Sequence, residues 1–425
     1  MAFESAHNYS EYQNYKEIKR NLNIFYHNIN MAELCAVDLI NAIVLHKNET
    51  WYHVFCVLLQ RLNVKPLYQA FQQNKNVFTF AAKERKDHEE LSHAICNSVE
   101  NSAWVRLEYF YSPYKIITRS FHFYRLIKRL PLSFVNKIFL MAKMVGYSCV
   151  IDDLETIFKE VSLTGRNYIP FCAPIYHEAI LTSFFKQKGV HTYFTFHGVF
   201  GRYQHQITND VVMGENVLSD QILAFGETQR QDLINDFGIN EKKIQVAGNP
   251  KYPYHPIILK ESYKSGLVLG GIGLYDNDLR ELLLVLEDVA KKTNISFSLK
   301  PHPLSNIQND SIWNELKHIQ LIDKSITIKS LLQQDMYDFA ITHNTSSYYE
   351  CFIFGLKPFR WAKDENINFE GLDDKFVNAS QLMKKVEKAS ATPMHSLSQE
   401  AEILLKRVLG FGINKYNQYI NEPVE

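Results

Sequence analysis

The chain has 425 residues, of which 46% are hydrophobic, 22% charged and 13% aromatic. This length and apolar content suffice for two domains with separate cores, and they exclude extended disorder. Lysine plus arginine number 46 and aspartate plus glutamate number 46, so the formal net charge is zero. A general nucleic-acid binder normally carries a basic excess. We therefore expect a folded protein of enzyme size, without a nucleic-acid partner.

The first half of the sequence predicts strands that alternate with helices. Five short runs rich in aromatic and β-branched residues are typical of buried parallel strands. These runs are 22–26, 77–81, 105–109, 168–173 and 192–196. Between them, 32–46 and 177–188 carry apolar residues at helical spacing. Strands that alternate with helices indicate an α/β domain with a parallel sheet.

The second half follows the same pattern with clearer turn signals. We expect strands at 266–269, 295–300, 319–322 and 339–342, and helices at 279–292, 325–334 and 348–354. The proline-rich run 249–256 is the expected linker. The predicted domains are therefore 1–252 and 257–395, followed by a helical segment at 396–425.

Cysteine spacing and hydropathy bear on the cellular compartment. The six cysteines are scattered, with no CxxC pair and no zinc-ligand spacing, so we expect reduced thiols in a cytoplasmic protein and no metal site. Residues 1–16 are polar and mixed in charge, unlike a secretory signal. No apolar stretch approaches the ~18–20 residues that span a bilayer, so any attachment to the inner membrane would be peripheral.

One stretch breaks the even distribution of charge. Between Ser112 and Val150 there is no acidic residue, and aromatic side chains are interleaved with basic ones. The basic residues are Lys115, Arg119, Arg125, Lys128, Arg129, Lys137 and Lys143. Two interpretations are open: a solvated helix face beside a core-facing aromatic stripe, or a surface for anionic lipid or an anionic polysaccharide.

A histidine between two prolines is the strongest local signal for a binding site. Lys300-Pro301-His302-Pro303 ends a predicted strand, and the prolines fix the backbone there. The imidazole of His302 is then presented at the carboxyl edge of the sheet, where it could donate a hydrogen bond to a phosphate. A histidine in a tight turn is the structural alternative.

Two further segments follow predicted strands. The hydroxyls of Thr345, Ser346 and Ser347 precede a predicted helix, where they either bind an anion or act as ordinary N-caps. Glu350 lies on the first turn, within reach of a ribose hydroxyl or of the positive helix end. After strand 266–269, Gly271 and Gly273 allow either a close approach to phosphate or a plain tight turn.

The first half offers two candidates for a catalytic base. His197 stands before Gly198 at the end of strand 192–196, where a neutral imidazole could deprotonate a hydroxyl. A histidine with a purely structural role is the alternative. Asp152 and Asp153 follow the apolar run 148–151 and are the alternative, although placement at a helix N-terminus would equally explain them.

The order and spacing of these segments resemble a known superfamily. The segments are Phe196-His197-Gly198, 219–226, 243–250, Lys300-Pro301-His302-Pro303, 345–350 and 355–358. Over roughly residues 190–360, the chain resembles the GT-B glycosyltransferases of bacterial surface polysaccharides. The most similar groups are the bacterial sialyltransferases, the Kdo transferases and the teichoic-acid-type CDP-polyol phosphotransferases.

The resemblance implies an α/β, GT-B-like fold: two Rossmann-like domains whose parallel sheets face a central cleft. Such enzymes bind the nucleotide donor in the C-terminal domain and the acceptor in the N-terminal one, and they usually need neither metal nor cofactor. Their terminal helix often crosses back to the first domain, as we expect for 396–425. Sugar-nucleotide 2-epimerases share this architecture, but their usual Ser-Gly-Gly phosphate loop is absent at 345–347.

The resemblance also assigns roles to individual residues. The resemblance implies that His302, Ser346 and Ser347 hold the donor phosphate. The remaining donor-binding candidates are proposed from the sequence alone: Lys300, Thr345, Glu350, Gly271 and Gly273. His197 matches the base of the polyol enzymes, although Phe196 stands where they have Trp. The carboxylate base of the sialyltransferases would be Asp153, although Leu154 replaces the glycine that usually follows closely.

The function expected from this comparison is a metal-independent, inverting glycosyltransferase. It would move a CMP-activated sialic acid or Kdo-type sugar onto a bacterial surface polysaccharide, a lipooligosaccharide or a lipid-linked glycan. The alternatives are a teichoic-acid-type CDP-polyol phosphotransferase and a polysaccharide-binding module without catalysis.

Overall fold

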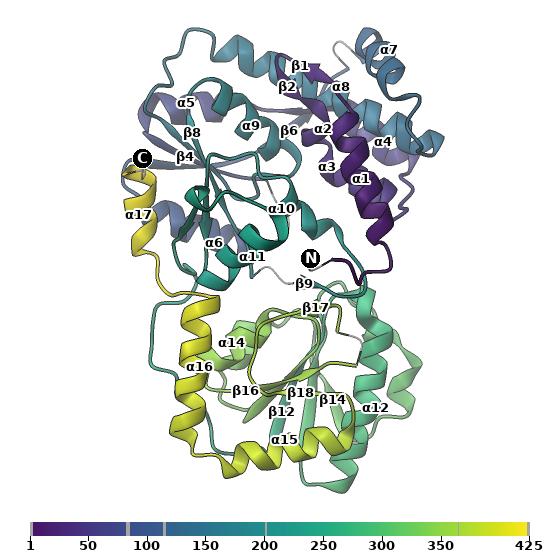
Figure 1. The fold of residues 1–425 in the computed structure, drawn as a ribbon, viewed down its shortest axis with the longest axis vertical. Helices are drawn as coiled ribbons and strands as arrows, with labels where there is room; N and C mark the ends of the chain where they lie inside the picture. Colours follow the sequence, from purple (N-terminus) through teal and green to yellow (C-terminus); the bar gives the residue numbers. More distant parts are fainter. Residues whose placement is uncertain (1–2, 82–85, 114–115, 200–201, 364, 423–425) are drawn as a thin grey trace. The chain divides into compact units, whose positions relative to one another are not determined.

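The computed structural model describes residues 3–81, 86–113, 116–199, 202–363 and 365–422 (Figure 1). By contact, the chain divides into two compact units. Unit 1 comprises residues 1–197, 206–253 and 410–425, and unit 2 comprises 198–205 and 254–409. The fold is the α/β, GT-B-like one that the resemblance implies, with a six-stranded parallel sheet in each unit.

The sheet of unit 1 has the strand order β11-β10-β8-β7-β4-β5, and all neighbours are parallel. The strands are β4 (Asn76–Phe80), β5 (Ser102–Arg106), β7 (Asn167–Pro170), β8 (His191–Thr195), β10 (Gln221–Ala224) and β11 (Ile244–Val246). All five residues of β4 and all four of β7 are buried. Such continuous burial is typical of parallel strands that are covered by helices on both faces.

Twelve helices are described in unit 1. They are α1 (Tyr9–Asn21), α2 (Met31–Leu34), α3 (Ala36–Ile43), α4 (Trp51–Leu59), α5 (Lys65–Gln73), α6 (Lys86–Asn97), α7 (Ile116–Ile127), α8 (Phe134–Ile157), α9 (Tyr176–Gln187), α10 (Val212–Glu215), α11 (Glu227–Phe237) and α17 (Asn414–Asn421). The sequence accounts for several of their ends. Ser133 caps α8 by accepting from the Asn136 amide, and Gly238 ends α11 with a φ of 68°, which glycine adopts without strain.

Three predictions for unit 1 were wrong in part. The segment 22–26 is not a parallel strand, because only β1 (Phe25–Tyr26) is extended and it pairs antiparallel with β2 (Ile29–Asn30). The helix expected at 32–46 is broken at Cys35 into α2 and α3. The strand expected at 105–109 begins earlier, as β5, and a separate β6 (Tyr109–Tyr111) pairs antiparallel with β3 (Gln60–Leu62).

Helix α8 corrects the expectation that no apolar stretch is long enough to span a bilayer. By length and composition alone, its 24 residues could cross a membrane, whereas the sequence had indicated no such stretch. However, 78% of its most apolar window is buried inside the protein. The helix therefore serves as a core element of unit 1, which is the commoner role of a long buried apolar helix.

The sheet of unit 2 has the strand order β14-β13-β12-β15-β16-β18, again all parallel. The strands are β12 (Ser265–Leu269), β13 (Ser296–Lys300), β14 (Ile319–Leu321), β15 (Phe339–Thr342), β16 (Lys357–Trp361) and β18 (Lys375–Phe376). A two-residue pair, β9 (Arg202–Tyr203) and β17 (Ile367–Asn368), runs antiparallel. The four strands expected from the sequence in this half are confirmed as β12 to β15.

The helices of unit 2 are α12 (Asp276–Lys292), α13 (Ile328–Leu332), α14 (Ser347–Ile353), α15 (Ala379–Ala391) and α16 (Met394–Val408). Helix α12 has acidic residues in its first turn and lysines in its last, which suits the helix dipole. The helix expected at 325–334 is shorter than predicted, because Thr327 caps it by accepting from the Ser330 amide.

Candidate active site

A cavity of about 500 Å³ lies at the carboxyl edge of the unit 1 sheet. Segments that follow β4, β7 and β8 form one wall, and helices α4, α6, α8 and α9 with strands β3 and β6 form the rest. Its described lining is Val57, Gln60, Ala81, His88, Tyr109, Lys143, Gly146, Tyr147, Phe171, Cys172, Ile175, Tyr176, His177, Glu178 and His197. Parallel α/β sheets bind ligands at this edge, and a mostly apolar wall with a few polar groups is typical of a ligand site.

His197 reaches this cavity from the end of β8, as the sequence predicts for its position. Its ring centroid lies 4.9 Å from that of His88, at the start of α6. Its Nδ1 lies 3.8 Å from the Sγ of Cys172, which follows β7. Two neighbouring strand ends and a helix start thus bring three polar side chains together at one end of the cavity.

Two adjacent residues at the start of α9 have strongly shifted acidities. Burial lowers the pKa of His177 to about 3, so its imidazole is neutral. Burial raises the pKa of Glu178 to about 8, although its carboxyl group accepts from three donors. These donors are the Phe171 amide at 3.3 Å, the Cys172 amide at 3.2 Å and the Thr79 hydroxyl at 3.3 Å. Glu178 therefore holds the backbone of residues 171–172 in place, and with it the Cys172 side chain beside His197.

Lys143 brings a cation into the apolar wall. Burial works against its ammonium, but the carboxylate of Asp38, 3.5 Å away, holds the pKa of Lys143 above its ordinary value. The ammonium also lies 4.8 Å from the ring centre of Tyr176. Tyr176 has a φ of 50°, a strained backbone conformation for a side chain of its size. Such strain, at the wall of a cavity, is a further sign of a functional site.

The two alternatives for the catalytic base, His197 and the pair Asp152–Asp153, lie in different places. Asp152 and Asp153 lie inside α8, toward its C-terminal end, rather than at a helix N-terminus. Asp152 accepts from the Tyr26 hydroxyl at 2.8 Å and pairs with Arg119. In the described part of the chain, neither aspartate lines the cavity. The geometry therefore favours His197.

Sequence reasoning missed most of the cavity wall. The sequence did not mark His88, His177 or Glu178 as site residues, because they lie on helices in otherwise ordinary helical patterns. It placed Lys143 in the exposed basic stretch, whereas the structure buries this side chain in the cavity wall. A signal for two of them was present. His177 and Glu178 follow the strand predicted at 168–173, at the edge where parallel sheets bind ligands.

The candidate donor residues gather at the corresponding edge of the unit 2 sheet. Strands β13, β12 and β15 are neighbours, and the segments that follow them carry His302, Gly271 and Thr345 respectively. The two candidate glycines have a packing role. A Cβ on Gly273 would lie 2.6 Å from the Leu304 carbonyl oxygen, and one on Gly271 would lie 3.0 Å from that of His343. Close backbone packing between loops thus suffices to explain both glycines.

Lys300 and His302 both donate or accept hydrogen bonds at the turn after β13, and Lys300 also reaches the loop after β14. The Lys300 ammonium donates to the carbonyls of Pro301 at 2.8 Å and Lys324 at 3.0 Å, and burial lowers its pKa. The Nδ1 of His302 accepts from the Leu304 amide at 3.1 Å, so this nitrogen is unprotonated and a neutral His302 carries its proton on Nε2. That tautomer directs an N–H donor away from the turn.

A polar network orders the segment after β15. Asn344, with a φ of 47°, accepts from the amides of Asn366 at 2.9 Å and Ile367 at 3.2 Å. Thr345 accepts from the Ser347 amide at 3.3 Å. Ser346 is the N-cap of α14, and Ser347 and Glu350 lie in its first turn. The hydroxyls expected at this helix start are therefore in place.

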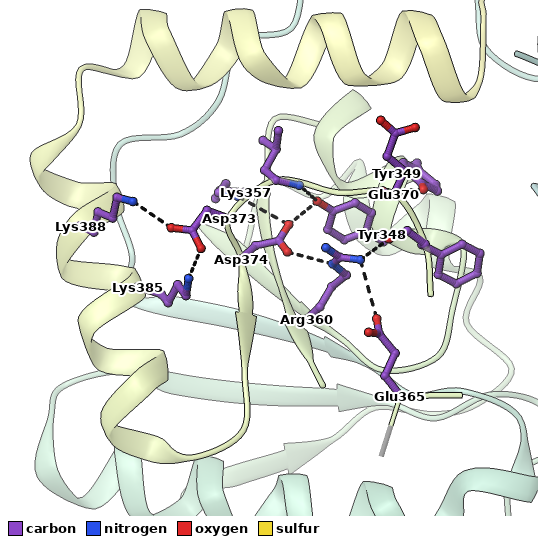
Figure 2. Close-up of polar contacts among 12 residues, drawn as sticks. Tyr348, Tyr349, Lys357, Arg360, Glu365, Glu370, Asp373, Asp374, Lys385 and Lys388 are labelled. Atoms are coloured by element: carbon purple, nitrogen blue, oxygen red, sulfur yellow. Dashed lines mark hydrogen bonds and ion pairs between the residues drawn. The ribbon is translucent and has the colours of Figure 1, made fainter. Parts of the chain in front are cut away.

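A buried ion cluster ties α14 to β16 (Figure 2). Arg360 donates to Asp374 at 2.8 Å and to the Phe369 carbonyl at 2.6 Å. Tyr348, on α14, donates to the other oxygen of Asp374. Since α14 begins at Ser347 and carries Glu350 in its first turn, this cluster holds the helix of these candidate donor residues in position.

Neither metal ligation nor sequence comparison assigns a function to the described residues. Among the described residues, no group of three or more His, Cys, Asp or Glu side chains is arranged to hold a metal ion. No protein-family model and no curated protein sequence matches the chain.

Solved structures resemble the chain in fold. The glycotransferase of kitacinnamycin is 13% identical with a TM-score of 0.50, over 82% of this chain and 98% of that chain. The UDP-GlcNAc 2-epimerase from Neisseria meningitidis, bound to UDP-GlcNAc, is 11% identical with a TM-score of 0.46, over 82% and 98%. The 2-epimerase from Rickettsia bellii is 13% identical with a TM-score of 0.47, over 83% and 99%. Identities this low are evidence for the fold alone.

Proposed function

We propose that the protein is a metal-independent glycosyltransferase that uses a nucleotide sugar, with the unit 1 cavity as its acceptor site. The observation that carries the proposal is His197 in a 500 Å³ cavity, beside His88 and Cys172, at the carboxyl edge of a parallel sheet. The GT-B-like fold supports it, because this fold is the framework of many nucleotide-sugar enzymes. We propose a CMP-activated sialic acid or Kdo-type sugar as the donor, and a surface glycan as the acceptor.

In the proposed reaction, His197 acts as general base. Its imidazole takes the proton of an acceptor hydroxyl as that oxygen bonds to the anomeric carbon of the donor. The bond from this carbon to the phosphate oxygen breaks, and the nucleotide leaves with the electron pair. His302 and the hydroxyls of Thr345, Ser346 and Ser347 would stabilise the departing phosphate as hydrogen-bond donors.

The test identifies which donor the protein uses and which type of bond it forms. The protein would be incubated with a glycan acceptor and, in turn, CMP-sialic acid, CMP-Kdo, UDP-GlcNAc and CDP-glycerol, and products would be identified by mass spectrometry. A glycosidic product is expected only from a CMP-sugar. In thermal unfolding, CMP at about 100 times its dissociation constant should stabilise the protein by about 2.7 kcal/mol.

The variant His197→Asn should lower kcat by about 10²–10⁴-fold and leave the KM for the donor unchanged. His255→Asn, at an exposed position of unit 2, is the matched control. Full activity in His197→Asn would overturn the assignment of the base. A phosphodiester from CDP-glycerol, conversion of UDP-GlcNAc without acceptor, or no reaction with any donor would overturn the proposed function in favour of a polyol phosphotransferase, a 2-epimerase or a binding module.

A further inference from the structure

Helix α4 presents apolar side chains to solvent. Of its nine residues, WYHVFCVLL, only Val54 is buried. Trp51, Tyr52 and Phe55 are 51%, 73% and 61% exposed. A surface helix normally turns its apolar stripe toward the core, and a cluster of exposed aromatic residues usually marks an interaction site.

Helix α7 has a second outward apolar face. Ile117 and Phe121 lie one turn apart on the same side of the helix and are 75% and 69% exposed. The inward side buries Phe123 and Ile127. Because Arg119 is anchored to α8 by bonds to Ser148 and Asp152, α7 is held with Ile117 and Phe121 outward.

Exposed cations follow these apolar residues. Arg125, Lys128 and Arg129 are exposed, and they form no ion pair with any residue in the described ranges. Both α4 and α7 pack against α8. At the start of α8, the ring of Phe134, which is 59% exposed, lies 6.4 Å from that of Trp51. The basic segment thus leads directly into an aromatic cluster.

We propose that unit 1 docks on the surface of an anionic phospholipid membrane through this region. We call the exposed side chains the aromatic–basic surface, which consists of Trp51, Tyr52, Phe55, Ile117, Phe121, Arg125, Lys128, Arg129 and Phe134. The charge of this surface indicates which kind of partner it binds. Unpaired lysine and arginine beside exposed aromatic residues suit anionic headgroups over an apolar interior, whereas the core of a protein–protein interface is depleted in lysine.

The same elements also form part of the cavity wall. Residues Val57 and Gln60 come from α4 and the adjoining β3, and Lys143 and Tyr147 come from α8. If the proposed function holds, docking would bring the acceptor site to the membrane, as a lipid-linked glycan acceptor requires. This last step rests on the proposed function, but the docking itself does not.

The test is flotation of the purified protein with vesicles, without donor or acceptor. Vesicles of phosphatidylcholine mixed with phosphatidylglycerol should bind the protein, and vesicles of pure phosphatidylcholine should not. The double variant Arg125→Gln/Lys128→Gln should weaken partitioning by about 25-fold, which is about fivefold for each basic residue. Trp51→Ser/Phe121→Ser should also lower binding strongly, since it removes two apolar contacts on separate helices.

Two matched controls replace exposed residues outside the surface. Lys242→Gln/Lys243→Gln removes two exposed lysines of unit 1, and Ile258→Ser/Ile403→Ser replaces two apolar residues of unit 2 that are 78% and 57% exposed. Both should bind like the wild type. Absence of binding to anionic vesicles, or equal losses in surface and control variants, would overturn the proposal. So would a dimer that Trp51→Ser/Phe121→Ser converts to a monomer, because a second copy would then occupy the surface.

Because vesicle binding is measured without catalysis, its failure is distinguishable from failure of the proposed function. An active enzyme that ignores vesicles would contradict docking alone. A vesicle-binding protein without transferase activity would contradict the proposed function alone.

Discussion

At the scale of single residues, the cavity of unit 1 depends on side chains whose protonation states burial controls. Glu178 accepts three hydrogen bonds, yet its desolvation dominates and its pKa rises to about 8. His177 beside it has a pKa lowered to about 3. Both are therefore neutral near pH 7, so that Lys143, paired with Asp38, is the charged group of this wall.

These shifts predict how the stability of unit 1 depends on pH. The unfolded chain binds more protons than the folded one at His177 between pH 3 and about 6.5, so stability rises with pH there. At Glu178 the folded chain keeps a proton from about pH 4.5 to 8, so stability falls with pH. Above about pH 6.5 only the second effect remains, and the Tm of unit 1 should fall between pH 6.5 and 8.

Scanning calorimetry across this pH range would measure the effect. Glu178→Gln cannot titrate, so it should flatten the fall, although it loses one acceptor and is less stable at every pH. Glu160→Gln, on the exposed surface of the same unit, is the control. An unchanged slope in Glu178→Gln would show that another group causes the fall.

At the scale of elements, the loop after β12 is packed tightly against the loop after β13. Gly273 is a clear case, because a Cβ there would lie 2.6 Å from the backbone oxygen of Leu304. Asp276 adds a tie between the same loops, since it accepts from the Ser305 hydroxyl at 2.6 Å and from the Asn306 amide at 2.9 Å. The loop that carries His302 is therefore held in one place.

Gly273→Ala should lower the free energy of unfolding by about 1–3 kcal/mol, because a backbone oxygen must move to admit the methyl group. Chemical denaturation would measure the change. Gly198→Ala is the control, since nothing lies within 4 Å of a Cβ there and its backbone is not left-handed. If the two variants were equally stable, close packing would not be the reason for Gly273.

The buried ion cluster around Asp374 yields a prediction with opposite outcomes for two substitutions. Asp374→Asn removes the carboxylate that faces Arg360 and Lys357, so it should cost about 3–5 kcal/mol. Lys357→Met should be neutral or stabilising, because the Lys357 ammonium is buried, makes no hydrogen bond in the described structure, and has a pKa lowered by burial. Guanidinium unfolding would measure both. Equal losses would mean that Lys357 contributes as a charge.

The sequence predicted strands that form continuous apolar runs, but it missed the interior strands β10 and β16 as well as the shortest strands. Strands such as β12 and β15 are continuous apolar runs, and burial on both faces determines that pattern. Two-residue strands such as β1 and β17 have no periodicity, because their pairing depends on partners distant in the chain. His197 could be placed at the edge of the sheet because it ends a recognisable strand. His88 and Lys143 lie on helices, and their position at the cavity depends on tertiary packing.

At the scale of the whole molecule, unit 1 is assembled from three separate stretches of chain. Helix α17 packs within this unit. Tyr416 donates to the Gly248 carbonyl at 2.9 Å, and the carbonyl of Ile420 accepts from Asn167 at 2.8 Å. Tyr416 belongs to the same core cluster as Phe78, Ile169 and Leu223 of the central strands. The stability of the first sheet therefore depends on residues that lie 253 positions away in the case of Asn167 and Ile420.

Tyr416→Phe should lower the stability of unit 1 by about 1–3 kcal/mol, because the buried Gly248 carbonyl loses its donor. Hydrogen exchange would detect this as faster exchange of the β7 and β8 amides, with those of β12 and β15 unchanged. Tyr419→Phe is the control, since the Tyr419 side chain is only partly buried. Equal acceleration in both units would contradict the assignment of α17 to the first.

The interrupted path of the chain has a consequence for biosynthesis. As the polypeptide leaves the ribosome, nearly all of unit 2, residues 254–409, emerges as one continuous stretch and can collapse without waiting for later sequence. The first sheet emerges earlier but lacks α17 until residues 414–421 have been translated. During that interval its nascent strands keep an uncovered apolar face, which is the kind of surface that chaperones bind. A translational pause or premature stop before residue 414 would therefore impair the part of the protein that was made first.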